Sequence, residues 1–215
     1  MEDLIIAIDG PAGAGKSTIA KIISEKLNIT YIDTGAMYRA LTYKVLKNNI
    51  NLKDKDKIVK LLNNTTIDFN DSHIYLDGKI VDSEIRENNI SQNVSLVAKI
   101  KDVRLKLVEI QRKISENKSV VMDGRDIGSY VLPNANYKFY ITATPEERGR
   151  RRYNELTKKQ KKVNLNEIIS DIKKRDKTDS TREIAPLIKT KDAILIDTTN
   201  KSIEEGVKEV LSYII

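Results

Sequence analysis

Cysteine is absent from this chain of 215 residues, and histidine occurs only once. Without cysteine the chain can form no disulfide, no thiolate nucleophile and no cysteine-ligated metal site, which fits a reducing compartment. The one histidine, His73, falls in a predicted hairpin with no apparent metal partner, where we expect a surface or packing role. The sequence therefore excludes cysteine chemistry and offers little for histidine-based acid–base catalysis.

Long apolar runs are also missing. The sequence begins MEDLIIAIDG, which has no basic stretch and an apolar run too short for a signal peptide or a membrane span. The hydrophobic fraction of 40% and the charged fraction of 32% are typical of a globular protein. We expect a cytoplasmic protein that binds no membrane.

Positive charge is concentrated in one late segment. The formal net charge is +7, and residues 144–191 contain 15 Lys and Arg against 8 Asp and Glu, which accounts for the whole excess. Such a segment suits a solvated surface, a nucleic-acid face or a site for a phosphorylated small molecule. Tyr153 is its only aromatic residue, and this scarcity disfavours the base stacking of a nucleic-acid site.

Short apolar runs alternate with helical patterns along the chain. The runs are rich in β-branched residues and predict five buried strands, at 4–9, 29–33, 119–123, 137–142 and 193–197. Apolar residues at helical spacing predict helices at 18–27, 102–116 and 203–214. This alternation predicts an α/β fold with a five-stranded parallel sheet between two helical layers, and ligands bind such sheets at the carboxyl ends of the strands.

Residues 65–82 depart from that pattern. They alternate apolar and polar residues and carry the turn signals Asn70-Asp71 and Asp77-Gly78. They predict a small antiparallel insert of two or three strands.

The stretch GPAGAGKST matches the phosphate-binding loop pattern G-x-x-x-x-G-K-[ST], after a predicted strand and before a predicted helix. Glycines let successive N–H groups turn inward around phosphate oxygens, and the helix N-terminus adds partial positive charge. We expect Lys16 to reach the β- and γ-phosphates and Ser17 to ligate Mg²⁺. The predicted ATP-binding residues of this loop are Gly10, Pro11, Ala12, Gly13, Ala14, Gly15, Lys16, Ser17 and Thr18.

Three classes of protein could use such a loop: a GTPase switch, a nucleic-acid-driven ATPase and a small-molecule kinase. The guanine-reading N-K-x-D motif is missing: at Asn200-Lys201 the motif's fourth position is Ile203 instead of Asp. A kinase whose acceptor is already a phosphate needs no general base, which agrees with the single histidine. The interpretation as a small-molecule kinase accounts for more residues of the sequence than the other two interpretations.

Four further motifs carry a family resemblance: YIDTGAMYRALT (31–42), SLVAKIKDVR (95–104), VVMDGRDIGSYVLPNA (120–135) and RDKTDSTREIAPL (175–187). Together with the phosphate-binding loop they make nearly the whole chain resemble the bacterial-type cytidylate (CMP) kinases. The resemblance implies phosphorylation of CMP and dCMP to CDP and dCDP by in-line transfer from ATP with Mg²⁺. We also expect a monomer that binds no nucleic acid.

The family's organisation maps onto the chain as a core, a monophosphate-binding region and a helical lid. The implied ranges are core 1–33, monophosphate-binding region 34–100 with the insert 65–82, core 101–144, lid 145–174 and core 175–215.

The resemblance also implies roles for single residues. Arg39 and Arg125 would bind the acceptor phosphate, Asp126 would accept a hydrogen bond from the cytosine amino group, and Asp123 would hold water on Mg²⁺. The full implied CMP-binding set is Thr34, Arg39, Ser95, Arg104, Arg125, Asp126, Asp179 and Arg182. Asp179 and Arg182 are three apart, so on a helix they would share a face.

The lid has its own implied residues. Arg148 and Arg152 would contact ATP, and Arg175 would approach the transferring phosphoryl group. The implied catalytic residues are Lys16, Arg125, Arg152 and Arg175. We assign to solvent five other basic side chains of the lid, Arg151, Lys158, Lys159, Lys161 and Lys162.

Two alternatives stay open. One is another small-molecule P-loop kinase, acting on UMP, another monophosphate or shikimate. The other is a nucleic-acid-binding P-loop ATPase.

Overall fold

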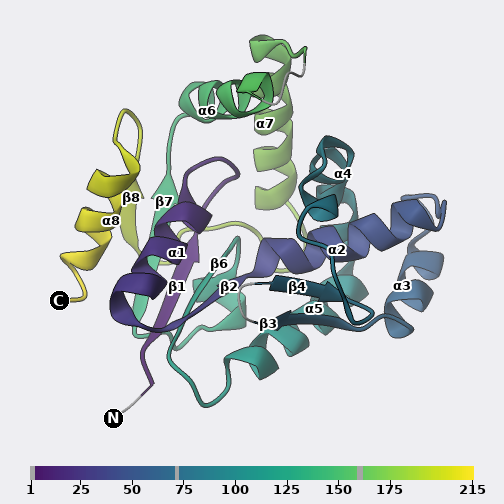
Figure 1. Cartoon of the computed structure of the whole chain (residues 1–215), viewed down its shortest axis with the longest axis horizontal. Helices are drawn as coiled ribbons and strands as arrows, with labels where there is room; N and C mark the ends of the chain where they lie inside the picture. The colour runs from purple at the N-terminus through teal and green to yellow at the C-terminus, as the bar shows by residue number, and fades with distance from the viewer. Residues whose placement is uncertain (1–2, 71–72, 159–161) are drawn as a thin grey trace. The chain divides into compact units, whose positions relative to one another are not determined.

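The computed structural model describes residues 3–70, 73–158 and 162–215. The chain forms two compact units: unit 1 comprises Met1–Tyr31 and Ser119–Ile215, and unit 2 comprises Ile32–Lys118 (Figure 1). Along the described ranges no helix combines the length and apolarity needed to cross a bilayer.

Unit 1 is built on the predicted five-stranded sheet. Its strand order is β2-β6-β1-β7-β8, and β1 pairs in parallel with both β6 and β7, as β7 does with β8. The strands are β1 (Ile5–Asp9), β2 (Thr30–Asp33), β6 (Val120–Gly124), β7 (Tyr137–Thr142) and β8 (Ile194–Asp197). The chain passes into unit 2 within β2, at Ile32.

The central strands are apolar because both of their faces are covered. Ile6, Ala7 and Ile8 of β1 are completely buried, as are Val120 to Met122 of β6, which is the pattern of a parallel sheet. Polar residues begin where the strands end. Asp123 of β6 lies in register with Ile8 of β1, two residues before Gly10 of the phosphate-binding loop.

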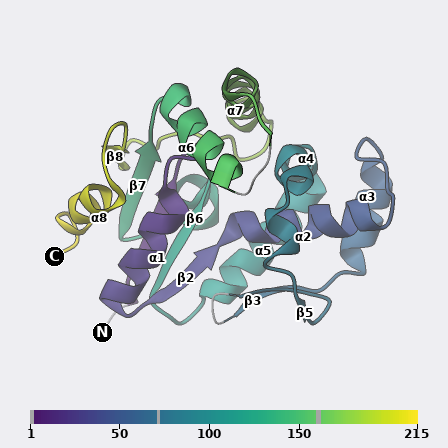
Figure 2. The ribbon, with the colours of Figure 1, turned by 45° about the horizontal axis from the view of Figure 1, so that its top comes forward.

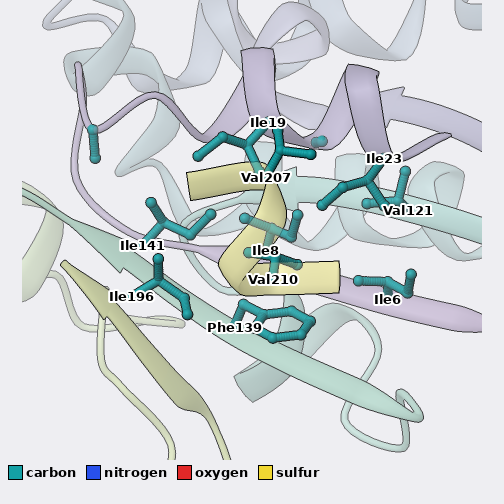
Figure 3. Packing of buried hydrophobic residues seen from close by; sticks show 12 residues of the cluster. Ile6, Ile8, Ile19, Ile23, Val121, Phe139, Ile141, Ile196, Val207 and Val210 are labelled. Atoms are coloured by element: carbon teal, nitrogen blue, oxygen red, sulfur yellow. The ribbon is translucent and has the colours of Figure 1, made fainter. Parts of the chain in front are cut away.

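Two helices of unit 1 pack over one face of this sheet. They are α1 (Lys16–Leu27) and α8 (Ile203–Leu211), which ends earlier than the predicted 214. Ile19 and Ile23 of α1 and Val207 of α8 lie among the side chains of the sheet in one cluster (Figure 3). A capping box between Ser202 and Glu205 starts α8.

The remaining helical elements of unit 1 follow β6 and β7. They are the π-helical turn η2 (Ile127–Val131), α6 (Pro145–Lys158) and α7 (Leu165–Ser180). α6 and α7 lie side by side (Figures 1 and 2). A Cβ at Gly149 would lie 2.4 Å from Ile169 Cγ1, so the absence of a side chain there permits this close helix packing.

Unit 2 combines helices with the predicted antiparallel insert. Its helical elements are α2 (Thr34–Lys47), α3 (Lys55–Asn63), η1 (Glu84–Arg86), α4 (Asn88–Ala98) and α5 (Lys101–Ser115). Its sheet has the order β3-β4-β5, with both pairs antiparallel. The strands are β3 (Ile67–Asn70), β4 (His73–Leu76) and β5 (Lys79–Ile80).

The turn between β4 and β5 follows the sequence signal. Asp77 and Gly78 both have positive φ, 50° and 75°, as a two-residue hairpin turn requires. His73 is exposed and paired with Asp82, which confirms its expected surface position. The second residue of the other turn signal, Asp71, lies outside the described residues.

Candidate active site

The phosphate-binding loop connects β1 to α1 in unit 1, as its pattern predicts (Figure 1). Gly10 has φ +143°, and a Cβ there would lie 1.9 Å from the Ile141 carbonyl oxygen, so only glycine fits. Gly15 has φ +87° and is the N-cap of α1. The predicted residues Gly10 to Thr18 thus form a strand–loop–helix connection with the helix N-terminus at its end.

Lys16 lies within this loop and is only 4% exposed. Its Nζ donates a hydrogen bond of 3.0 Å to the Pro11 carbonyl, which folds the side chain back across the loop. Burial lowers the pKa of Lys16 to about 7, and Arg125 lowers it further while Asp123 opposes the shift. The amine is therefore poised to gain a proton when an anion arrives beside it.

Ser17 meets Asp123 beside the loop. The Ser17 hydroxyl donates to Asp123 Oδ2 at 2.8 Å, and the Tyr31 hydroxyl donates to Asp123 Oδ1 at 2.9 Å. A hydroxyl and a carboxylate are oxygen donors of the kind Mg²⁺ prefers. Among the described residues no three His, Asp or Glu side chains converge on a possible metal position.

Four predicted acceptor residues of unit 1 form one charged cluster. Arg125 Nε donates to Asp179 Oδ2 at 3.0 Å, and Arg182 lies 3.4 Å from Asp126 Oδ1 and 4.0 Å from Asp179 Oδ1. Arg175 Nε is 3.9 Å from Asp179. Burial raises the pKa of Asp179, but Arg125, Arg175 and Arg182 outweigh it and the net pKa is lowered. The cluster gathers guanidinium groups around a carboxylate that stays ionised.

One premise about this cluster was wrong. α7 ends at Ser180 and Thr181 is its C-cap, so Arg182 lies beyond the helix and shares no helical face with Asp179. The two side chains converge because the chain turns back after the helix, where Arg182 Nε donates to the Ala185 carbonyl and the Leu187 N–H donates to the Asp179 carbonyl.

Arg148 and Arg152 of α6 have different surroundings. The Arg148 side chain is 3% exposed and forms a two-pronged ion pair with Asp176 of α7, at 3.0 and 2.6 Å. Arg148 also donates to the carbonyls of Ala143 and Ala12, the second of these within the phosphate-binding loop. Arg152 is more exposed and pairs with Glu155. Contact of either arginine with ATP stays a prediction.

The assignment of Arg151 to solvent is wrong. Its guanidinium donates to Glu147 Oε1 at 2.9 Å and to the Thr198 carbonyl at 2.6 Å. The Thr198 hydroxyl in turn bonds the Ala14 carbonyl at 3.0 Å. Arg151 therefore ties α6 to the phosphate-binding loop through Thr198. Lys158 and Lys162 are exposed as expected, and Lys159 and Lys161 lie outside the described residues.

Asp9, at the end of β1, is a residue that the sequence reasoning missed. Its Oδ1 and Oδ2 accept hydrogen bonds of 2.7 Å from the N–H groups of Ile127 and Gly128. Burial raises the pKa of Asp9 to about 7, although those two N–H groups lower it. The available signal was an acidic residue at the end of a buried strand, directly before the loop.

In unit 2, Thr34 and Arg39 lie on α2 beside Asp33. Thr34 is buried in the first turn, and Arg39 Nη1 lies 3.8 Å from Asp33 Oδ2. Asp33 caps the helix by accepting from the Ala36 N–H, and it also pairs with Arg86 of η1 at 2.7 Å. Burial raises the pKa of Asp33, but Arg39 and Arg86 outweigh it and the net pKa is lowered. The sequence reasoning missed both Asp33 and Arg86.

The other predicted residues of unit 2 lie on α4 and α5. Ser95 is half-buried on α4. Arg104 on α5 is 2% exposed, donates to the Ala98 carbonyl at 3.2 Å and lies over the Tyr38 ring, 5.0 Å from its centroid. A buried guanidinium held against an aromatic face is a preorganised donor.

Comparison with known proteins gives matches along the whole chain. A protein-family model described as cytidylate kinase matches residues 6–215. The cytidylate kinase of Clostridioides difficile (strain 630) is 59% identical over 214 residues, which cover 100% of this chain and 99% of that one. The cytidylate kinase of Alkaliphilus oremlandii (strain OhILAs) is 57% identical over 212 residues, covering 99% and 98%.

Solved structures of lower identity share the fold. An uncharacterized protein from Eubacterium ventriosum ATCC 27560 gives a TM-score of 0.57 at 16% identity, covering 99% of this chain and 98% of that one. A gluconokinase from Sinorhizobium meliloti 1021 gives 0.53 at 12% identity, covering 97% and 90%. At these identities the likeness concerns the fold alone.

Proposed function

The chain belongs to the cytidylate kinase family, and on that premise we propose that it transfers the γ-phosphoryl group of ATP to CMP and dCMP. The observation that carries the proposal is the hydrogen bond of 2.8 Å between Ser17 and Asp123. It joins the phosphate-binding loop to the segment that contains Arg125 and Asp126. The donor loop thus adjoins the segment whose Arg125 and Asp126 would bind the acceptor.

The donor end of the reaction rests on the phosphate-binding loop. Its N–H groups and Lys16 would hold the β- and γ-phosphates, and Ser17 with Asp123 would hold Mg²⁺, Asp123 through water. When bound, Mg²⁺ neutralises charge that develops on the phosphate oxygens. Thr18 would bind ATP with the rest of the loop. The pKa of the buried Lys16 amine is about 7, so this amine would become fully protonated only beside the bound phosphate.

Acceptor recognition is proposed for each unit from its own residues. In unit 1, Arg125 would grip the CMP phosphate, Asp126 would accept the cytosine 4-amino hydrogen bond, and Asp179 with Arg182 would hold the ribose hydroxyls. In unit 2, Arg39 would bind phosphate while Thr34, Ser95 and Arg104 would contact the nucleotide. A carboxylate suits cytosine because uracil offers a carbonyl at the same position and would be repelled.

Transfer itself needs alignment and positive charge rather than a base. The acceptor phosphate is already nucleophilic, so the protein's task is to hold two anions in line and exclude water. Arg125, Arg152 and Arg175 would neutralise charge on the transferring group, and Arg148 and Arg152 would contact ATP from the lid, 145–174. We also propose that the enzyme works as a cytoplasmic monomer and binds neither nucleic acid nor membrane.

The test is product analysis under three conditions. The protein is incubated with MgATP alone, with MgATP and CMP, and with MgATP and RNA or single-stranded DNA. We expect ADP and CDP in equal amounts with CMP, and little ADP otherwise. ADP formation that RNA or DNA stimulates, and CMP does not, would identify the protein as a nucleic-acid-driven ATPase instead.

A further inference from the structure

Asp9 lies beside the phosphate-binding loop, and the proposed function gives it no role. It is the last residue of β1, directly before Gly10 of the phosphate-binding loop, and it is 6% exposed. Both carboxylate oxygens accept a backbone hydrogen bond of 2.7 Å, Oδ1 from Ile127 and Oδ2 from Gly128. These two donors open η2, immediately after Arg125 and Asp126.

These two hydrogen bonds fix the end of the short connection between β6 and η2. β6 ends at Gly124, which lies in register with Asp9, and the connection continues through Arg125 and Asp126 to Ile127. The β1–β6 ladder holds its beginning and the Asp9 carboxylate holds its end. Arg125 and Asp126, the two residues between, therefore have little freedom to shift along the edge of the sheet.

Only a carboxylate fits both donors. Two acceptor oxygens on one planar group match two successive N–H groups, whereas an asparagine would direct its amide NH₂ at one of them. The space for a side chain at position 128, which faces Asp9, is also restricted. A Cβ on Gly128 would lie 3.4 Å from Asp9 Oδ2 and 3.1 Å from Lys138 Cδ, so the loop approaches Asp9 closely because residue 128 is glycine.

We propose that Asp9 is a positioning residue for the acceptor nucleotide, acting through the Ile127 and Gly128 N–H groups to set where Arg125 and Asp126 meet phosphate and base. The inference rests on the proposed function for the identity of that nucleotide. Asp9 touches neither substrate in this account. Since it adjoins Gly10 and lies near Lys16, a purely structural role would disturb the ATP end at least as much as the acceptor end.

The test compares kinetic constants of Asp9→Asn with those of wild type, with Asp192→Asn as control. Asp192 is an exposed carboxylate of the same unit that pairs with Lys138. We expect the KM for CMP to rise about 10- to 100-fold in Asp9→Asn, because this factor corresponds to the loss of one hydrogen bond to a charged acceptor. The KM for ATP should change by about twofold or less, as for a separate site. Equal changes in the two constants, or none, overturn the proposal.

Hydrogen exchange provides a second readout that does not depend on turnover. In Asp9→Asn the amides of 127–128 should exchange faster, while the amides of 13–17 keep their protection. Unchanged exchange at 127–128 would show that the carboxylate does not hold the loop. If Asp9→Asn fails to fold, Gly128→Ala replaces it, because it disturbs the same contact without removing the carboxylate, and the same asymmetry between CMP and ATP is required.

Failure of the inference and failure of the proposed function are distinguishable. If wild type does not phosphorylate CMP, the proposed function is wrong whatever Asp9 does. If wild type phosphorylates CMP and Asp9→Asn shifts both substrates equally, only the role of Asp9 is wrong.

Discussion

The Ser17 hydroxyl donates a hydrogen bond of 2.8 Å to Asp123 Oδ2, although 106 positions separate the two residues in the chain. This bond joins the end of the phosphate-binding loop to the end of β6, the strand beside β1. Mg²⁺ would be held by side chains of two elements, Ser17 in the first turn of α1 and Asp123 at the end of β6. The bond supports the proposal that Mg²⁺ and the ATP phosphates bind at this edge of the sheet.

Replacing Asp123 should weaken use of the metal more than binding of the nucleotide. In Asp123→Asn we expect the Mg²⁺ concentration for half-maximal activity to rise about 10- to 100-fold, as for lost partners of a metal site. ATP binding without Mg²⁺, measured by calorimetry, should change little. Tyr31→Phe is the control, because it removes the other hydrogen bond to Asp123 and leaves the carboxylate. An unaltered Mg²⁺ dependence in Asp123→Asn would contradict the assignment.

Binding of MgATP should be accompanied by proton uptake at Lys16. The pKa of Lys16 in the free protein is about 7, so at pH 8 about nine in ten of these amines are neutral. An adjacent phosphate raises that pKa, and about 0.9 proton is taken up per nucleotide bound. Between pH 7 and 9 the affinity should therefore fall as the pH rises, by up to about tenfold per unit.

Calorimetry in buffers of different ionisation enthalpy measures that uptake. At pH 6 Lys16 is already protonated, so the same protein should take up about 0.1 proton there and serves as its own control. Asp9, whose pKa burial also raises to about 7, is distinguished by Asp9→Asn, which should retain most of the uptake. Equal proton uptake at pH 6 and pH 8 would rule out Lys16 as the group that titrates.

Arg148 and Arg152 should differ in their effect on stability, although both lie on α6. Arg148→Ala removes a buried guanidinium bonded to Asp176 and to the Ala12 and Ala143 carbonyls, which we expect to cost about 2–3 kcal/mol of unfolding free energy. Arg152→Ala, the matched control, loses a more exposed pair worth about 0–1 kcal/mol. Urea denaturation measures both changes. Equal losses of unfolding free energy in the two variants would show that the buried contacts of Arg148 do not stabilise the fold.

Asp126 should determine which base is accepted. Asp126→Asn removes the charged acceptor for the cytosine amino group, so the ratio of kcat/KM for CMP to that for UMP should fall about 10- to 100-fold. The KM for ATP should stay near the wild-type value. A reduced ATP affinity with an unaltered CMP to UMP ratio would remove Asp126 from base recognition.

Local patterns in the sequence were enough to predict the sheet and the phosphate-binding loop. Each strand is a short apolar run, and the loop needs glycines, Lys16 and Ser17 at fixed spacing, so their signals lie within a few neighbouring residues. The hairpin insert was predictable for the same reason, from alternation and the Asp77-Gly78 turn.

The missed contacts join residues far apart in sequence, and no local pattern reports them. Asp9 meets Gly128 across 119 positions, and Asp33 meets Arg86 across 53. Arg151 looked like one more charge in a basic run, and only the fold brings Thr198 to it. The convergence of Asp179 and Arg182 came from the turn after α7 rather than from helical spacing.

The acceptor profile of the wild-type enzyme tests the central claim most directly. Initial rates with MgATP are measured over a range of CMP, dCMP, UMP, AMP and GMP concentrations, and kcat/KM is compared across the five. The proposed recognition of cytosine by Asp126 predicts that kcat/KM for CMP and dCMP exceeds that for the other three by about tenfold or more. Turnover of UMP or AMP that equals or exceeds that of CMP would contradict it.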